Sequence, residues 1–177
     1  MIILGVDPGS RSTGYGVVSV EGNRIRCVDY GAIRPKGRPQ ELPMQERLKT
    51  IFDGLEAVIL QHRPEVAAVE SVFHAANVKS ALTLGHVRGV VLLALANSGV
   101  ALREYSPLEV KRAVAGYGRA DKQQVQTMVR MLLKLAELPQ PHDASDALAI
   151  ALCQAFSGGR TTRRHRRWRS AEVSNSG

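Results

Sequence analysis

The stretch that decides the fold is IILGVD at residues 2–7, with PGS immediately after it at residues 8–10. Its first five residues are apolar or glycine and do not alternate with polar residues. That pattern predicts a central β-strand that is covered on both faces. A Pro-Gly-Ser sequence is typical of a turn. The strand would therefore carry a carboxylate, Asp7, at its very end, and this position calls for an explanation.

The remaining strands and helices are predicted from hydrophobic periodicity. Short apolar runs indicate strands, and apolar residues recurring every three or four positions indicate amphipathic helices. Strands that cluster first and then alternate with helices favour an α/β fold, in which helices pack on a mixed sheet. The predicted strands span residues 2–7, 14–20, 24–33, 66–70 and 100–105, and the predicted helices span 40–62, 77–98, 106–116, a segment after Asp121, and 143–156.

The length of 177 residues suits one domain with a sizeable core. We expect residues 1–157 to form this domain and residues 158–177 to be a disordered, arginine-rich tail, because the apolar pattern ends there. The net charge is +8, and the tail contributes six arginines against one glutamate. A basic chain suggests a polyanionic partner such as nucleic acid, but a solvated tail on an ordinary enzyme explains the charge equally well.

Cysteine content and hydropathy exclude several classes of protein. The two cysteines, Cys27 and Cys153, are far apart in the sequence, which argues against a disulfide framework or a zinc knuckle and favours a reducing compartment. The N-terminus has no signal-peptide pattern. The longest apolar run, residues 89–96, is far shorter than the roughly 20 residues of a membrane span. We therefore expect a cytoplasmic protein without a membrane segment, in which this run belongs to a core helix or to a subunit interface.

Four carboxylates are candidates for a metal site. Glu70, like Asp7, ends a short apolar strand, and ligand sites in α/β sheets lie outside strand ends. The sequence DASD places Asp143 and Asp146 on one face of a helix. Four carboxylates that face one point cannot all stay charged without cations, and hard oxygen ligands suit Mg²⁺ or Mn²⁺. Such ions typically serve phosphoryl transfer, in which one activates water and another stabilises the leaving oxygen.

Each of these residues also has a purely structural interpretation. Asp7 could begin a turn, Asp143 could interact with a helix dipole, and Glu70 could pair with an arginine. Asp146 is harder to explain in this way, because it lies past the first turn of an apolar helix. Together the four favour a metal site. The neighbouring His142 could assist a water molecule, although a histidine near a helix start is more often simply solvated.

Four motifs in the chain resemble those of the RuvC family of bacterial crossover-junction endodeoxyribonucleases. They occur in family order and with family-like spacing between about residues 2 and 156. A single GVDPG would be weak support, whereas four separate motifs are specific. The motifs are DPGSRSTGYG, ESVFHAANVKSALTLGHVRGV, VKRAVAGYGRADKQQVQTMVRMLLKL and DASDALAIA.

The resemblance implies an RNase H-like fold with a mixed five-stranded sheet and helices on both faces. It implies a homodimer that resolves Holliday junctions in recombination and DNA repair, each subunit cutting one strand to leave 5′-phosphate and 3′-hydroxyl ends. The implied cofactor is Mg²⁺, two ions per subunit, with Mn²⁺ able to substitute, and the implied partners are four-way junction DNA and the RuvA–RuvB branch-migration complex. The implied metal ligands and catalytic residues are Asp7, Glu70, Asp143 and Asp146.

The resemblance also implies candidate DNA contacts. Phe73 matches an aromatic residue that stacks on bases, although it could be a core residue, and Lys111 and Lys122 match lysines near the scissile phosphate, although both could be ordinary surface lysines. Arg119 and Arg130 are further candidates. A polar stripe at every fourth position of one helix could follow a DNA backbone or simply keep the helix soluble; its residues are Lys122, Gln126, Arg130 and Lys134.

Three other functions remain as alternatives. A nuclease of the same fold could act on RNA–DNA hybrids, and substrate assays would distinguish it. An actin-like kinase or ATPase also begins with an apolar strand, Asp and Gly, but needs two related domains. A non-catalytic junction binder would gain nothing from acidic groups that face phosphate. The tail is outside the motifs; we expect its removal to weaken DNA binding at low salt without abolishing junction-selective cutting.

Overall fold

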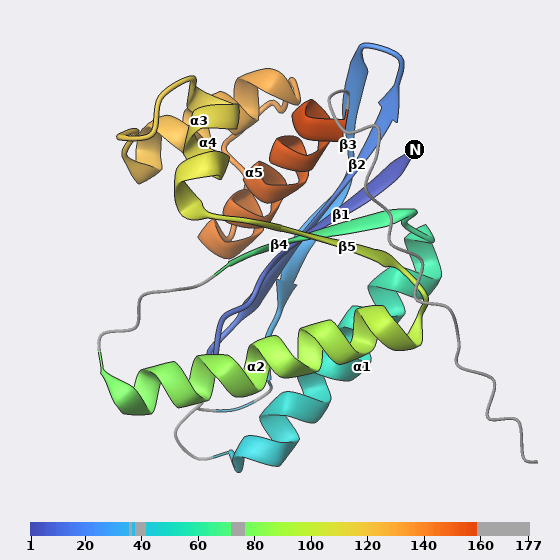
Figure 1. Cartoon of the computed structure of the whole chain (residues 1–177), viewed down its shortest axis with the longest axis vertical. Helices are drawn as coiled ribbons and strands as arrows, with labels where there is room; N and C mark the ends of the chain where they lie inside the picture. Colours follow the sequence, from blue (N-terminus) through green and yellow to red (C-terminus); the bar gives the residue numbers. More distant parts are fainter. Residues whose placement is uncertain (36, 38–41, 72–76, 159–177) are drawn as a thin grey trace, which may run out of the picture.

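A computed structural model describes residues 1–35, 37, 42–71 and 77–158. Its centre is a five-stranded sheet in the order β3-β2-β1-β4-β5 (Figure 1). The sheet is mixed, because β1 runs antiparallel to β2 and parallel to β4. This confirms the predicted five-stranded mixed sheet. The strands are β1 (Ile2–Asp7), β2 (Thr13–Glu21), β3 (Arg24–Ile33), β4 (Val66–Glu70) and β5 (Ala101–Tyr105).

Helices cover both faces of the sheet, as the resemblance implied. Two helices, α1 and α2, lie on one face, and α3, α4 and α5 lie on the other (Figure 1). Each face has its own apolar core, and the inner residues of β1 contribute to both, which is why this strand shows no alternation. The helices are α1 (Met44–His62), α2 (Val78–Asn97), α3 (Pro107–Ala115), α4 (Lys122–Leu132) and α5 (His142–Ser157).

The parallel pairing of β1 with β4 brings their ends together. Val6 lies opposite Val69 in the register, so the next residue of each strand, Asp7 and Glu70, reaches the same edge of the sheet. Across the antiparallel pair, Asp7 lies opposite Gly14. The strand order thus places two of the four predicted carboxylates at one end of the central strands.

Glycines let α5 approach the sheet at backbone contact. A Cβ added at Gly5 would collide with the main chain of Ala147, and one added at Gly14 would collide with the main chain of Asp143. At Gly16 the obstacle would be Leu148. Because larger residues would hold α5 away, these glycines of β1 and β2 fix how close its N-terminal turn comes to Asp7.

The boundaries of the elements differ from the predicted ones by a few residues. Within the described residues, α1 begins at Met44 rather than at residue 40, and β2 extends one residue further at each end than predicted. The predicted helix starts at Ser106 and Asp121 are both N-caps with complete capping boxes. The predicted disordered tail lies outside the described residues, apart from Gly158 at its start.

Helix α2 is more exposed than a core helix. Only Val87, Val91, Ala94 and Leu95 are buried, whereas Val78, Leu82 and Leu93 are more than half exposed. Among the described residues it is the one helix that is long and apolar enough to cross a membrane, a criterion of length and composition that water-soluble helices also meet. One side of α2 therefore belongs to the core, whereas apolar residues on its other side face solvent.

Candidate active site

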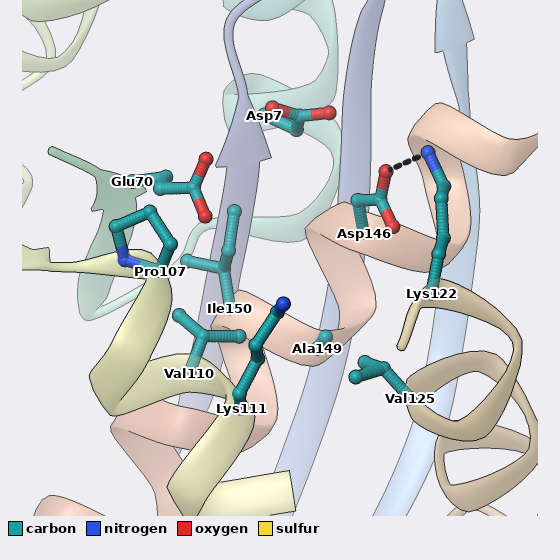
Figure 2. A pocket seen from close by; sticks show the side chains of 10 residues that line it. All are labelled: Asp7, Glu70, Pro107, Val110, Lys111, Lys122, Val125, Asp146, Ala149 and Ile150. Atoms are coloured by element: carbon teal, nitrogen blue, oxygen red, sulfur yellow. Dashed lines mark ion pairs between the residues drawn. The ribbon is translucent and has the colours of Figure 1, made fainter. Parts of the chain in front are cut away.

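Three of the four predicted carboxylates line one pocket at the end of the central strands. Asp7 comes from β1, Glu70 from β4 and Asp146 from the second turn of α5, and Figure 2 shows them around a common hollow with two lysines. Its remaining lining is largely apolar and comes from α3, α4 and α5. The lysines are Lys111 and Lys122, and the other lining residues are Pro107, Val110, Val125, Ala149 and Ile150.

The fourth carboxylate, Asp143, lies one helical turn before Asp146 at the start of α5. Its side chain is not among those that line the pocket, but its charge acts on Asp7 and raises the pKa of that carboxyl. Its main chain packs directly against Gly14. The fold therefore assembles the four carboxylates, hereafter the carboxylate site, from two strand ends and one helix start.

The carboxylate site is electrostatically strained. Burial, followed by repulsion from Asp146, Glu70 and Asp143, raises the pKa of Asp7 to about 7, while Lys122 opposes this shift. Burial and Asp146 also raise the pKa of Glu70, against the lowering effect of the two lysines. Carboxyl groups whose pKa values are raised in a cleft are characteristic of functional sites, and a cation beside them would favour their ionised form.

Lys122 supplies part of the missing positive charge. Its Nζ lies 2.8 Å from Oδ2 of Asp146, and this hydrogen bond raises the pKa of the lysine. The side chain of Lys122 is 60% exposed, so the ammonium remains accessible from solvent. The capping box at Asp121 starts α4 at this lysine and so fixes where its side chain begins. Lys122 therefore stays available for the phosphate contact predicted for it.

The residues present fit a hard divalent cation by donor type. Every predicted ligand offers carboxylate oxygens, which are the donors that Mg²⁺ and Mn²⁺ prefer. Burial, and after it the repulsion from neighbouring carboxylates, raises the pKa of Asp7, and a cation beside the group would counteract both effects. Among the described residues, no three histidine, cysteine, aspartate or glutamate side chains lie close enough to hold an ion together. The fold thus brings the carboxylates to one end of the sheet, but their side chains are not close enough together to form a complete coordination sphere.

Arg88 of α2 also supports the site, and its role was not predicted from the sequence. Its Nη1 donates to the main-chain oxygen of Glu70 at 2.7 Å, and its Nη2 pairs with the carboxylate of Glu104 on β5. The arginine thus fastens α2 to the strand end that carries Glu70. A lone arginine in the apolar part of a helix was the signal that could have indicated a buried polar contact.

The predicted polar stripe on α4 is wrong. Gln126 is buried rather than exposed, and its Nε2 lies 2.7 Å from Nδ1 of His142. Lys134 lies beyond the end of α4 with a left-handed φ of 54°. The spacing of four therefore does not produce one solvent-facing row. For His142 the structure shows a hydrogen bond between helices, and its predicted assistance to a water molecule stays a prediction.

The other predicted DNA contacts have different placements. Lys111 lines the pocket beside Glu70. Arg119 is exposed in the connection between α3 and α4, and Arg130 is partly exposed near the end of α4. Phe73 lies outside the described residues. The structure thus brings two of the five predicted DNA contacts, Lys111 and Lys122, to the carboxylate site.

A mixed sheet of the RNase H-like type, with acidic residues at the ends of its central strands and at a facing helix start, defines a metal-dependent nuclease. Residues 3–154 match the family described as Crossover junction endodeoxyribonuclease RuvC. The chain belongs to this RuvC family, whose members are nucleases that hydrolyse DNA.

Individual relatives agree with the family assignment. The crossover junction endodeoxyribonuclease RuvC of Heliobacterium modesticaldum is 53% identical over 157 residues, which cover 89% of this chain and 95% of that protein. The structure of Thermus thermophilus RuvC in complex with Holliday junction substrate matches with a TM-score of 0.83 and 40% identity, over 89% of this chain and 94% of that one. The yeast mitochondrial resolvase Ydc2 shares 14% identity at a TM-score of 0.58 and supports the fold alone.

Proposed function

We propose that this crossover junction endodeoxyribonuclease resolves Holliday junctions in recombination and repair by cutting two strands symmetrically, leaving 5′-phosphate and 3′-hydroxyl ends. The observation that carries the proposal is the pocket in which Asp7, Glu70 and Asp146 face Lys111 and Lys122. Acidic groups beside a phosphate are repulsive unless a cation lies between them. The combination of acids and lysines therefore suits the hydrolysis of a phosphodiester better than simple binding of DNA.

The carboxylate site would hold Mg²⁺, two ions in each subunit, with Mn²⁺ as a substitute. When bound, such ions lower the pKa of water and stabilise the charge on the leaving oxygen. The protein itself would supply the orientation of the strand: Lys111 and Lys122 are placed to contact phosphate oxygens beside the carboxylates. The apolar side chains of Val110, Val125 and Ile150 also line the pocket, and their low polarity would strengthen these charge interactions.

Symmetric cutting requires two active sites, and α2 offers a surface for a homodimer. Val78, Leu82 and Leu93 are exposed and fall on one face of the helix by their spacing. A Cβ added at Gly85 or Gly89 would meet nothing within 4 Å, so this side of the helix is smooth and open. Two copies of such a helix could pack closely, and Arg88 would connect this interface to the strand end of Glu70.

Partners and compartment follow from the resemblance. We infer that the dimer receives four-way junction DNA from the RuvA–RuvB branch-migration complex in the cytoplasm. A complex of the three proteins on a synthetic junction, detected by a shift in sedimentation or gel mobility, would support this assignment. Cutting at the same rate and positions with and without an active branch-migration complex would argue against functional coupling.

The experiment that tests the proposed function compares substrates. The purified full chain is incubated in Mg²⁺ with a labelled synthetic four-way junction, a linear duplex of the same sequence and an RNA–DNA hybrid, and Asp7→Asn serves as the inactive control. We expect paired nicks in the junction alone, and a ligase should seal them without further processing. If the protein cut the hybrid in preference to the junction, the assignment as a nuclease would hold, but the proposed substrate would be wrong.

A further inference from the structure

The turn that follows Asp7 is surrounded by arginines that the carboxylate site does not use. Arg11 lies within the turn and is exposed, Arg34 follows the end of β3, and Arg47 lies near the start of α1. We call these three residues the arginine cluster. Three segments that are distant in the sequence thus bring positive charge to one turn of the chain.

Hydrogen bonds fix two of the arginines on either side of this turn. Nη2 of Arg47 donates to the main-chain oxygen of Ser10, and Nε of Arg34 lies 3.5 Å from Oγ of Ser12. The hydroxyl of Thr13 closes the turn by donating to the main-chain oxygen of Gly9 at 3.2 Å. The flanking guanidinium groups are therefore held in place against the turn before any ligand arrives.

In the part of the chain that the structure describes, the positive charge of the cluster is uncompensated. Among the residues that the structure describes, neither Arg11, Arg34 nor Arg47 forms an ion pair with an acidic side chain. Nε of Arg47 is buried and has no hydrogen-bond partner there. Arg47 also lies near a helix N-terminus, where a cation is unfavourable. The exposed guanidinium groups of Arg11 and Arg34 therefore remain available to an anion, which would form charge-assisted hydrogen bonds with them.

The cluster lies next to the reaction centre. Arg11 is four residues from Asp7, so their Cα atoms are at most roughly 14 Å apart. Thr13 pairs with Ile33 at the same end of the sheet at which Asp7 lies opposite Gly14, and Arg34 directly follows Ile33. A DNA strand in the carboxylate site could therefore extend onto this turn.

We propose that Arg11, Arg34 and Arg47 form a binding site for a backbone phosphate of the junction strand, a few nucleotides from the phosphate that is cut. This inference rests on the proposed function, because it concerns the same DNA strand. The guanidinium groups would hold the strand in register with the carboxylates by bidentate contacts, without reading its sequence.

The test compares the cluster with matched arginines at the opposite end of the sheet. Arg24 and Arg26 are exposed on β3, the strand that leads to Arg34, but lie next to the hairpin at the far end. The variants Arg11→Gln, Arg34→Gln, Arg24→Gln and Arg26→Gln each lose one positive charge from an exposed side chain. Junction binding is measured in EDTA, so that nothing is cut, between 50 and 200 mM salt.

We expect the cluster variants to reduce the salt dependence of binding. The slope of log K against log salt is negative, and each lost phosphate contact reduces its magnitude by about 0.9. If both subunits of a dimer lose one contact, the magnitude of the slope decreases by about 1.8. The factor by which affinity is lost is then about 12 times larger at 50 mM salt than at 200 mM salt. Arg24→Gln and Arg26→Gln should leave the slope unchanged. Arg47→Lys, which keeps the charge but loses the fork, should weaken binding with a smaller change of slope.

Slopes that change equally in cluster and control variants would overturn the inference, because charge at any position would then have the same effect. Unchanged slopes in all the variants would overturn it as well. Neither result would affect the proposed function if the unsubstituted protein still nicks the junction in Mg²⁺. Conversely, a protein that binds the junction with the expected slopes but cuts nothing would leave the arginine site standing and contradict the proposed function.

Discussion

Gly14 of β2 lies directly against the main chain of Asp143, so that the strand opposite Asp7 also supports the helix start that carries the other two aspartates. No side chain larger than hydrogen fits between them. The distance between the carboxylates of the sheet and those of α5 is therefore set by a glycine, and this relationship can be tested without altering any charged group.

Gly14→Ala should leave the protein folded but raise the Mg²⁺ concentration that it needs for cleavage. The added methyl group pushes the first turn of α5 away from Asp7, and we expect a loss of about 1–3 kcal/mol in stability together with a higher Mg²⁺ concentration for half-maximal cutting. Gly16→Ala is the matched control, because it presses on Leu148, further along the helix. Equal shifts of the Mg²⁺ requirement in both variants would mean that Gly14 has no special role in positioning Asp143.

The metal-free protein should lose stability as the pH rises. Because burial and neighbouring carboxylates raise the pKa of Asp7 from 3.8 to about 7, the folded state keeps a proton that the unfolded state releases. Unfolding is therefore favoured progressively from about pH 4 to pH 7, by roughly 4 kcal/mol at most for this group. In EDTA, Asp7→Asn should melt several degrees above the unsubstituted protein at pH 8 and much closer to it at pH 4.5.

Thermal unfolding at these two pH values checks this prediction, and Mg²⁺ provides its control. Because a bound cation favours the ionised carboxylate, the ion should stabilise the unsubstituted protein more at pH 8 than at pH 5 and should stabilise Asp7→Asn less. A melting temperature of the metal-free protein that rises between pH 5 and pH 8, with no such difference in the variant, would show that Asp7 is not held at a raised pKa.

Lys122→Gln should change metal binding and cutting in opposite directions. Lys122 pairs with Asp146 and lowers the pKa of Asp7, so its removal leaves the carboxylates more repulsive and more dependent on a cation. We expect a lower Mg²⁺ concentration at half-maximal activity together with a lower maximal rate, because a phosphate contact is lost. Lys49→Gln, which removes an ion pair with Asp53 on α1, is the surface control. A higher Mg²⁺ concentration at half-maximal activity, or an unchanged maximal rate, would contradict the assignment.

Arg88→Ala should slow cutting without weakening junction binding in EDTA. The substitution removes the donor to the main-chain oxygen of Glu70 and leaves the end of β4 less fixed. Glu104→Gln is the matched control, since it disrupts the ion pair of Arg88 but keeps the contact with Glu70. Single-turnover rates and junction affinity together measure the effect. If both variants lose the same activity, Arg88 acts through Glu104 rather than by positioning Glu70.

The sequence predicted the parts of this structure that depend on local pattern. The buried strand before Asp7, the second strand that ends on Glu70 and the capping boxes at Ser106 and Asp121 all have short-range signals. The convergence of Asp7 and Glu70 followed from the general rule for strand ends. These features were sufficient to predict the sheet and two residues of the pocket, Asp7 and Glu70.

The missed features depend on contacts between distant segments. Gln126 has the spacing of a surface residue, yet it is buried because α5 brings His142 against it. Arg88 contacts Glu70 and Glu104, which are each 16 to 18 residues away. The periodicity of one helix shows its apolar face but not which polar residues beside that face a neighbouring helix will cover, so such polar contacts become visible only in the folded chain.

The most direct test of the central claim is the rate of Mg²⁺-dependent nicking of a synthetic four-way junction by the four single variants Asp7→Asn, Glu70→Gln, Asp143→Asn and Asp146→Asn. Each amide keeps the size of the side chain and removes its charge. We expect that every variant still binds the junction in EDTA and that every one loses cutting by orders of magnitude. If two or more of them cut at the rate of the unsubstituted protein, these carboxylates are not the site of the reaction.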